Sequence, residues 1–207
     1  MKLLTLDDGN QTDPLVTPTV ERAVLDGIQS KYKWTRFDEY DNRYSEYIDH
    51  LIVPTLKLAK VKRVETLWKK LNRPQKVFYA VFLFDGQVMN GGVWQFLYNH
   101  GELAVAALEA LEEIGANRLA SDYRVTLEEV MGKAESLGDL CREANQAGTF
   151  ATKWAAFAEG YKQLETTEAI ENYYHVKKFK KELYQQLCDY IEPQLNLFAK
   201  IRDAAVS

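Results

Sequence analysis

The chain has 207 residues, 46% of them hydrophobic and 27% charged. These values are ordinary for a globular protein large enough to bury a core without a disulfide or metal. The net charge of -4 disfavours general binding to nucleic acid or to an anionic membrane, although a local patch remains able to do either. A run of about 18 apolar residues, as a membrane span needs, is missing, and the first residues lack a signal-peptide core. With two cysteines far apart in sequence, we expect a cytoplasmic protein with reduced thiols.

The first half of the chain carries helical patterns after an irregular leader of 19 residues. A helix is expected from about Val20, and a clearer one from Tyr44 to Leu51. Apolar residues continue with helical spacing from Leu56 to Leu71, with Pro54 at a kink or at a helix start.

The segment 57–76 has a strongly basic outer face. Its cationic residues, set against Glu65 alone, are Lys57, Lys60, Lys62, Arg63, Lys69, Lys70, Arg73 and Lys76. Three interpretations stay open: a solvated helix face, pairing with acidic residues of the same chain, or contact with an acidic partner or nucleic acid.

The stretch 77–116 holds the densest apolar run and the Gly91-Gly92 pair. Residues 81–84 could form a buried strand, but the flanking residues favour a helix from about Pro74 to Asp85. A loop is expected at 86–92, in which Asn90 caps a second helix and the glycines permit a positive φ or a close helix approach. That second helix spans about 91–98, and a third spans 102–114 and is stopped by Gly115.

The C-terminal half is predicted to be helical as well. We expect an amphipathic helix at 119–131, a helix starting near Thr149 and one long helix from Ile170 to about Tyr190, with Pro193 as a kink. The prediction is therefore an all-α, single-domain bundle of about seven to nine helices. Residues 1–50 are expected to form an extension that packs on a helical domain at 51–207.

The residues around the glycine pair are similar to those of a known family. The pattern Asn-Gly-Gly, then aromatic-Gln-aromatic, Asn-x-Gly and Ala-Leu-x-x-Ile-Gly-Ala resembles the DUF4375 family of bacterial helical proteins, which includes the DMP19-type DNA mimics. The matching residues are Asn90, Gly91, Gly92, Trp94, Gln95, Phe96, Asn99, Gly101, Ala110, Leu111, Ile114, Gly115 and Ala116. The resemblance covers roughly residues 60–192. It implies a mostly α-helical fold, and DMP19-type members present carboxylates that imitate DNA phosphates and occupy DNA-binding proteins.

One part of this chain leans toward such an acidic surface. Residues 101–145 carry ten carboxylates and four basic residues. The candidate contacts are Glu109, Glu112, Glu113, Glu128 and Glu129. The resulting hypothesis is a non-enzymatic protein that binds another macromolecule, such as a DNA-binding protein. It gives no direct role to nucleic acid or membrane and leaves a homodimer open.

The alternative hypothesis is a small-molecule binder or enzyme with a pocket around the glycine pair. Its lining would be Asn90, Trp94, Gln95 and Asn99, although these residue types also serve as caps at helix ends. The three histidines lack metal-ligand spacing, and no known catalytic motif is present, so no cofactor, metal or catalytic residue is predicted.

Overall fold

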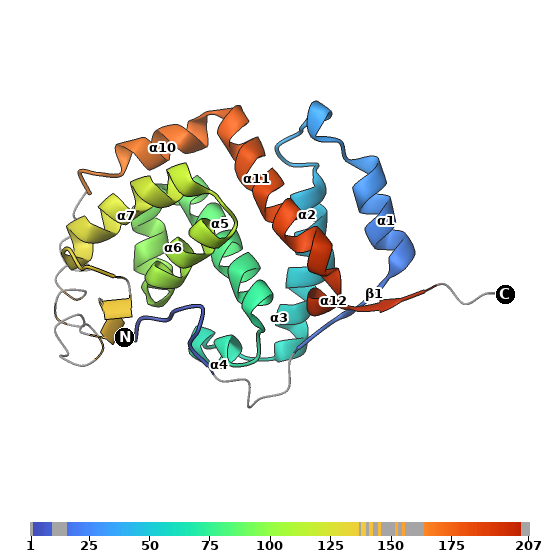
Figure 1. Cartoon of the computed structure of the whole chain (residues 1–207), viewed down its shortest axis with the longest axis horizontal. Coiled ribbons are helices and arrows are strands. Elements are labelled where there is room, and N and C mark those ends of the chain that lie inside the picture. The colour runs from blue at the N-terminus through green and yellow to red at the C-terminus, as the bar shows by residue number, and fades with distance from the viewer. Residues whose placement is uncertain are drawn as a thin grey trace. The chain divides into compact units, whose positions relative to one another are not determined.

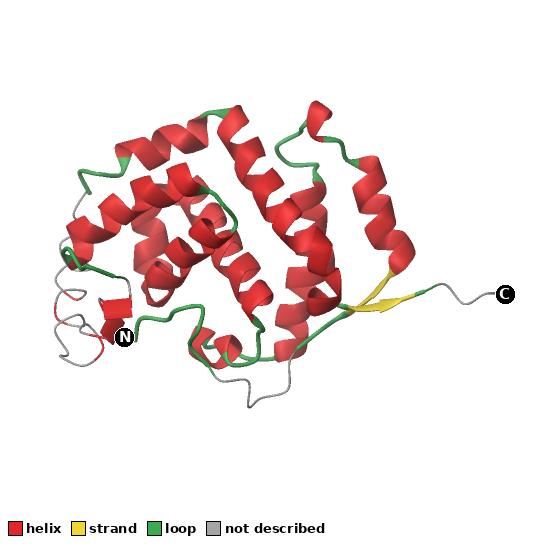
Figure 2. Cartoon of the chain, in the orientation of Figure 1, coloured by secondary structure: helices red, strands yellow, loops and turns green. Residues whose placement is uncertain are grey.

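The structure is a computed structural model that describes residues 2–9, 16–136, 138–139, 141–142, 145, 152, 155 and 164–203. The described chain is mostly helical, which confirms the predicted all-α class (Figures 1 and 2). It forms two compact units: unit 1 comprises residues 1–6 and 80–176, and unit 2 comprises residues 7–79 and 177–207. The expected division at residue 50 stays a prediction. The helix expected near Thr149 lies outside the described residues.

Unit 2 combines the first part of the chain with its C-terminal part. Its elements are β1 (Thr19–Glu21), α1 (Arg22–Lys31), η1 (Trp34–Arg36), α2 (Arg43–Tyr47), η2 (Ile48–Ile52), α3 (Val53–Ala59), α4 (Val64–Trp68), α11 (Lys177–Ile191), η4 (Glu192–Gln194), α12 (Leu195–Phe198) and β2 (Lys200–Arg202). The helix predicted at 44–51 is therefore two consecutive pieces, α2 and the π-helix η2, and α3 follows directly.

A short parallel sheet joins the two parts of unit 2. Strand β1 pairs with β2 in the register Thr19 to Lys200 and Glu21 to Arg202 (Figure 2). The helix expected from Val20 is thus wrong at its start, because Val20 is a strand residue and α1 begins at Arg22. Strand pairing across the length of the chain overrides the local helical pattern here.

Aromatic side chains fill the core of unit 2. The ring of Tyr44, on α2, stacks on that of Tyr184, on α11, at 4.3 Å between centroids. The ring of Phe78 packs against those of Tyr44 and Phe198, with 6.1 Å between ring centroids in each pair. All four side chains are buried, so helices from both ends of the chain share one apolar core.

Unit 1 is built on α5 (Arg73–His100), which begins in unit 2 and continues into unit 1. It is followed by η3 (Gly101–Leu103), α6 (Ala104–Glu113), α7 (Asn117–Met131) and α10 (Glu168–His175). The side chain of Asn72 accepts a hydrogen bond from the Gln75 amide at 2.9 Å, and the Gln75 side chain accepts one from the Asn72 amide at 3.0 Å. This reciprocal pair is a capping box, and it starts α5.

The predicted loop at 86–92 is wrong for most of its length. Helix α5 continues to Asn90, and only Gly91 (φ -160°) and Gly92 (φ 75°) leave the helical conformation. The apolar pattern on both sides of Gly86 therefore outweighs its low helix propensity. Gly92 adopts the left-handed region expected of the glycine pair, where a Cβ would be strained.

The core of unit 1 forms where α5, α6 and α7 meet. The ring of Phe84 packs against those of Tyr123 and Phe96, with centroid distances of 4.7 and 5.1 Å. The Tyr123 hydroxyl also donates a hydrogen bond of 3.0 Å to the Ala104 carbonyl. Helix α6 ends at Gly115 (φ 78°) as predicted, with the Ala116 amide returning to the Leu111 carbonyl at 2.8 Å.

The expected long C-terminal helix is divided at Val176, which has extended backbone angles between α10 and α11. The prediction of a single helix at 170–190 is wrong at that residue. Seven helices in the described part of the chain have seven or more residues, at the lower end of the expected number.

Candidate functional site

Two of the predicted acidic contacts hold the chain's own backbone. The carboxylate of Glu109 accepts a hydrogen bond from the Leu6 amide at 2.7 Å. Glu129 accepts from the amides of Glu165 and Thr166 at 3.0 and 3.1 Å, and from the Thr166 hydroxyl at 2.6 Å. These carboxylates fix the N-terminal segment and the turn before α10, so both have structural roles.

The other three predicted contacts are differently placed. Glu112 forms an ion pair with Arg124 at 2.6 Å, which joins α6 to α7. Glu113, beside it, is half-buried. Glu128 is half-buried on α7, and its side chain has no ion pair within the described residues. The structure therefore distributes the five residues over α6 and α7 and leaves little of their charge unpaired.

A second group of carboxylates lies on α10 and the turn before it. Glu165, Glu168 and Glu171 are exposed, and none forms an ion pair within the described part of the chain. With Leu164 and Thr167 they line a hollow of about 490 Å³. We call these three carboxylates the acidic surface of α10. Sequence reasoning missed them, although glutamates are common in a first helical turn.

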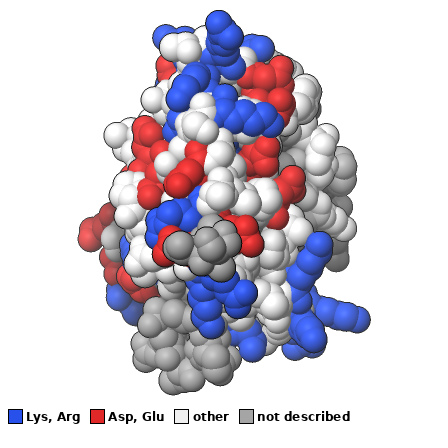
Figure 3. Space-filling model, turned by 90° about the vertical axis from the view of Figure 1, so that its right-hand side faces the viewer, with Lys and Arg blue, Asp and Glu red and all other residues white. Residues whose placement is uncertain are grey.

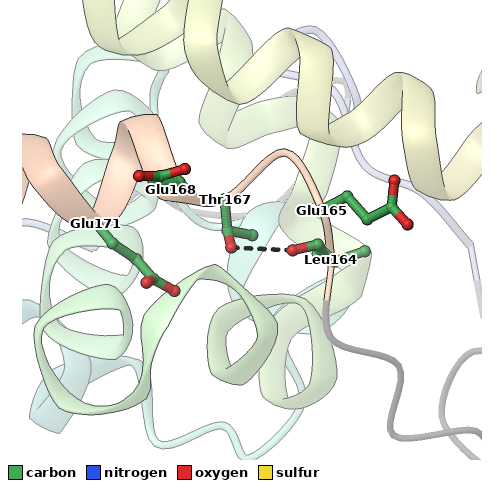
Figure 4. Close-up of a pocket in the computed structure, with 5 residues that line it drawn as sticks. All are labelled: Leu164, Glu165, Thr167, Glu168 and Glu171. Carbon is green, nitrogen blue, oxygen red and sulfur yellow. Dashed lines mark hydrogen bonds between the residues drawn. The ribbon is translucent and has the colours of Figure 1, made fainter.

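The side chains of the acidic surface of α10 diverge. Figure 4 shows Glu165 pointing away from Glu171, and the Thr167 hydroxyl donating to the Leu164 carbonyl, a bond of 3.2 Å. The described residues contain no group of three or more histidine, cysteine or acidic side chains suited to a metal ion. Diverging carboxylates suit contact with an extended partner better than enclosure of one small ligand.

The glycine pair lies next to this surface. A Cβ at Gly92 would come within 3.2 Å of Glu171 Oε1, and a Cβ at Gly91 would collide with Gln95 Oε1. Both of these neighbours are the ends of flexible side chains that would have to move, whereas at Gly92 the positive φ itself requires glycine. The motif allows α10 to approach the kink in α5.

The four residues of the alternative pocket are partly satisfied by local contacts. Gln95 Nε2 and Asn99 Nδ2 both donate to Gln87 Oε1, at 3.0 and 2.7 Å. Trp94 stacks on Tyr98 with 6.4 Å between ring centroids, and Asn90 is exposed. The structure thus places these residues along one helix, α5. The hollow described above has other lining residues.

His100, at the end of α5, is an ionisable group whose pKa is perturbed by burial. It is half-buried at the end of α5, and burial lowers the pKa of its imidazole, while the charge of Glu102 opposes that change. Its Nδ1 atom is buried and has no hydrogen-bond partner among the described residues. Burial without a carboxylate in hydrogen-bond contact favours the neutral imidazole.

The basic segment splits into two groups in the structure. Arg73 pairs with Asp7 at 2.5 Å, and the buried Lys76 amine donates to the Asp8 carbonyl at 2.7 Å. The remaining cations of the segment lie on α3, in the connection between α3 and α4, and directly after α4. Figure 3 shows basic and acidic side chains interleaved on the face that it draws, so this face is not a uniform acidic field.

Comparisons with known proteins give one family. The described helices include none long and apolar enough to cross a membrane. Neither the curated proteins nor the solved structures contain a significant match to the chain. The family of DMP19-like proteins matches residues 69–194, which include all of α5, η3, α6, α7, α10 and α11. Because this match covers more than half of the chain, the protein belongs to the DMP19-like protein family.

Proposed function

We propose that this protein is a non-enzymatic binding protein of the bacterial cytoplasm whose partner is a basic, DNA-binding protein. The contact surface is the acidic surface of α10. The observation that carries the proposal is that Glu165, Glu168 and Glu171 are exposed and unpaired in the described chain, while Glu109, Glu112 and Glu129 bind groups of the protein itself. Family membership supports the same function, because the resemblance to DMP19-type proteins implies carboxylates that imitate DNA phosphates.

The spacing of these carboxylates supports phosphate imitation. Glu168 and Glu171 are three residues apart on α10, which is a rise of about 4.5 Å along a helix axis. One strand of B-DNA carries a phosphate about every 3.4 Å along its axis. Two carboxylates at a comparable axial spacing offer charged acceptors to a basic groove, and charge-assisted bonds to arginine are the strong ones.

The small-molecule alternative is less well supported by the geometry. A ligand pocket needs polar groups that converge and keep bonding capacity for the ligand. The side-chain amides of Gln95 and Asn99 instead share Gln87 as acceptor. We therefore prefer the macromolecular partner.

The test compares three forms of the full chain in quantitative affinity capture. The first is the wild type, and the second carries Glu165→Lys, Glu168→Lys and Glu171→Lys. The control carries Glu21→Lys, Asp26→Lys and Asp189→Lys, which makes the same charge change at exposed positions of unit 2. Glu109 and Glu129 stay unchanged, because reversing them would break backbone contacts.

The expected result is that the wild type and the control capture the same DNA-binding protein, that salt elutes it, and that the α10 variant loses it. The interaction is electrostatic, so screening weakens it. Equal capture by the α10 variant would overturn the proposal. Circular dichroism of all three forms establishes that they are folded.

A further inference from the structure

Six cations of the basic segment have no anionic partner in the described chain. We call them the basic turn: Lys57, Lys60, Lys62, Arg63, Lys69 and Lys70. Five of the six are exposed and Lys70 is half-buried. The one carboxylate among them, Glu65, forms no ion pair with any of them. The basic turn is thus a concentrated and uncompensated positive charge on a protein whose net charge is -4.

Asp7 and Asp8 of the leader bind the two neighbouring cations of the segment, Arg73 and Lys76. Asp7 pairs with Arg73, and the Asp8 carbonyl accepts from Lys76, whose amine also lies 5.6 Å from the centre of the Trp68 ring. Gly9 then packs against the backbone of Lys69, where an added Cβ would lie 3.4 Å from its Cα. Residues 7–9 therefore contact one edge of the segment, and no described residue of the leader places a carboxylate on a cation of the basic turn.

The local fold concentrates these side chains. Helix α3 ends at Ala59, the left-handed conformation of the next residue, Lys60 (φ 52°), terminates it, and α4 begins at Val64. Lys62 and Arg63 are the exposed residues of the short connection. Leu67 and Trp68 face the core, so α4 is anchored by its apolar side and the cations remain in solvent.

We propose that the basic turn binds the phosphate backbone of duplex nucleic acid without sequence preference. A duplex presents about one negative charge per 1.7 Å of axis, which is enough to engage six cations over a short surface. Five of the six are lysines, point charges that suit phosphate contact, and the segment's aromatic residue, Trp68, is buried and cannot stack on bases. The basic turn therefore has the chemistry for backbone contact and lacks that for base recognition.

Two other anionic partners match the basic turn less well. An anionic membrane would need a larger apolar anchor than Leu58, the single exposed large apolar side chain of the segment at 53%. A second copy of this chain offers the three carboxylates of α10, which would leave half of the six cations unmatched. The duplex matches all of them, and its binding is independent of the function proposed for α10.

The experiment measures fluorescence anisotropy of a labelled random-sequence duplex with the full chain over a salt series. The test variant carries Lys57→Gln, Lys62→Gln, Arg63→Gln and Lys69→Gln. The matched control carries Lys33→Gln, Arg36→Gln, Lys200→Gln and Arg202→Gln, four exposed positions of unit 2 that lie outside the basic turn. Both variants lose the same charge, so a difference between them reports position. Lys60 is retained because of its left-handed backbone.

The wild type is expected to bind at low salt, and its slope of log affinity against log salt should be steep. The test variant should bind at least about tenfold more weakly, with a slope smaller by about 3 to 4, because each phosphate contact contributes about 0.9. The control should keep most of the slope and affinity, and so should the triple Lys variant of α10.

Three results would overturn the proposal: no duplex binding by the wild type at low salt, equal losses in test variant and control, or binding of phosphatidylserine vesicles in place of the duplex. Thermal unfolding of each variant shows whether it is folded. If the test variant is not folded, the pair Lys57→Gln and Lys69→Gln repeats the comparison against Lys33→Gln and Lys200→Gln.

Discussion

At the scale of single residues, the most distinctive motif of the chain has a structural role. Gly91 and Gly92 break α5 for two residues, and the neighbouring side chains of Gln95 and Glu171 occupy the space a Cβ would need. Gly86, in the same helix, has helical backbone angles and open space around it. The two positions therefore predict opposite responses to the same substitution.

Gly92→Ala should destabilise the protein by about 1 to 2 kcal/mol, because an L-residue is strained at this positive φ. Gly86→Ala should instead stabilise it by about 0.5 to 1 kcal/mol, since alanine is the better residue in a helix interior. Urea denaturation of both variants measures the two free energies of unfolding. Equal effects would contradict the kink described for α5.

Glu129 accepts hydrogen bonds from the turn before α10, whereas no such bond is described for its neighbour Glu128. Glu129→Gln should lower the free energy of unfolding by about 1 kcal/mol, because it weakens charge-assisted bonds to the Glu165 and Thr166 amides. Glu128→Gln should change it by less than about 0.5 kcal/mol, as is usual for a surface substitution. Urea denaturation of the two variants measures both free energies of unfolding. A larger effect at Glu128 would refute the structural role assigned to Glu129.

His100 should make stability depend on pH. Burial lowers its pKa below the ordinary value of 6.5, so the unfolded chain takes up a proton first as the pH falls. The free energy of unfolding should therefore decrease below about pH 6.5, and His100→Gln should lose this part of the decrease. Urea denaturation at a series of pH values tests it, and identical profiles would show that His100 is not responsible.

At the scale of elements, local signals predicted helix ends and missed long-range partners. The Asn72-Gln75 box and Gly115 act within a few residues, and the sequence located both helix boundaries. Pairing of β1 with β2 joins residues 19–21 to 200–202, which no local pattern indicates. The same reason applies to the candidate site, because the roles of Glu109 and Glu129 depend on segments far away in sequence.

Arg43 shows how elements of unit 2 are joined. Its guanidinium donates to both carboxylate oxygens of Glu192 at 2.9 and 3.2 Å, and to the carbonyls of Gln29 and Tyr32 at 2.9 and 3.0 Å. The Tyr47 hydroxyl donates to the same carboxylate at 3.1 Å. The Arg43 side chain is 14% exposed, so these bonds are largely shielded from water.

Arg43→Lys should destabilise the protein by about 3 kcal/mol, because lysine cannot reproduce the planar set of donors and leaves buried acceptors unpaired. The matched control is Arg22→Lys, at the exposed pair with Asp203, which should cost less than about 0.5 kcal/mol. Thermal or urea unfolding compares the two. Similar losses would contradict the buried network around Glu192.

At the scale of the whole molecule, the charged side chains fall into those that bind other groups of the protein and those that do not. Carboxylates such as Glu109, Glu112 and Glu129 bind groups of unit 1, whereas the acidic surface of α10 and the basic turn form no ion pair within the described part of the chain. Composition predicted the mild net charge, and the family resemblance suggested an acidic contact surface. Which glutamates remain available could not be predicted, because that depends on tertiary hydrogen bonds.

The most direct measurement of the proposed function is a competition between this protein and duplex DNA for the captured partner. The competitor is the full chain with the four Gln substitutions in the basic turn, so that it does not itself take up the duplex. We predict that it displaces labelled duplex from the partner, and that adding the three Lys substitutions in the acidic surface of α10 abolishes displacement. Equal displacement of the duplex by both forms would contradict the proposed function of the acidic surface of α10.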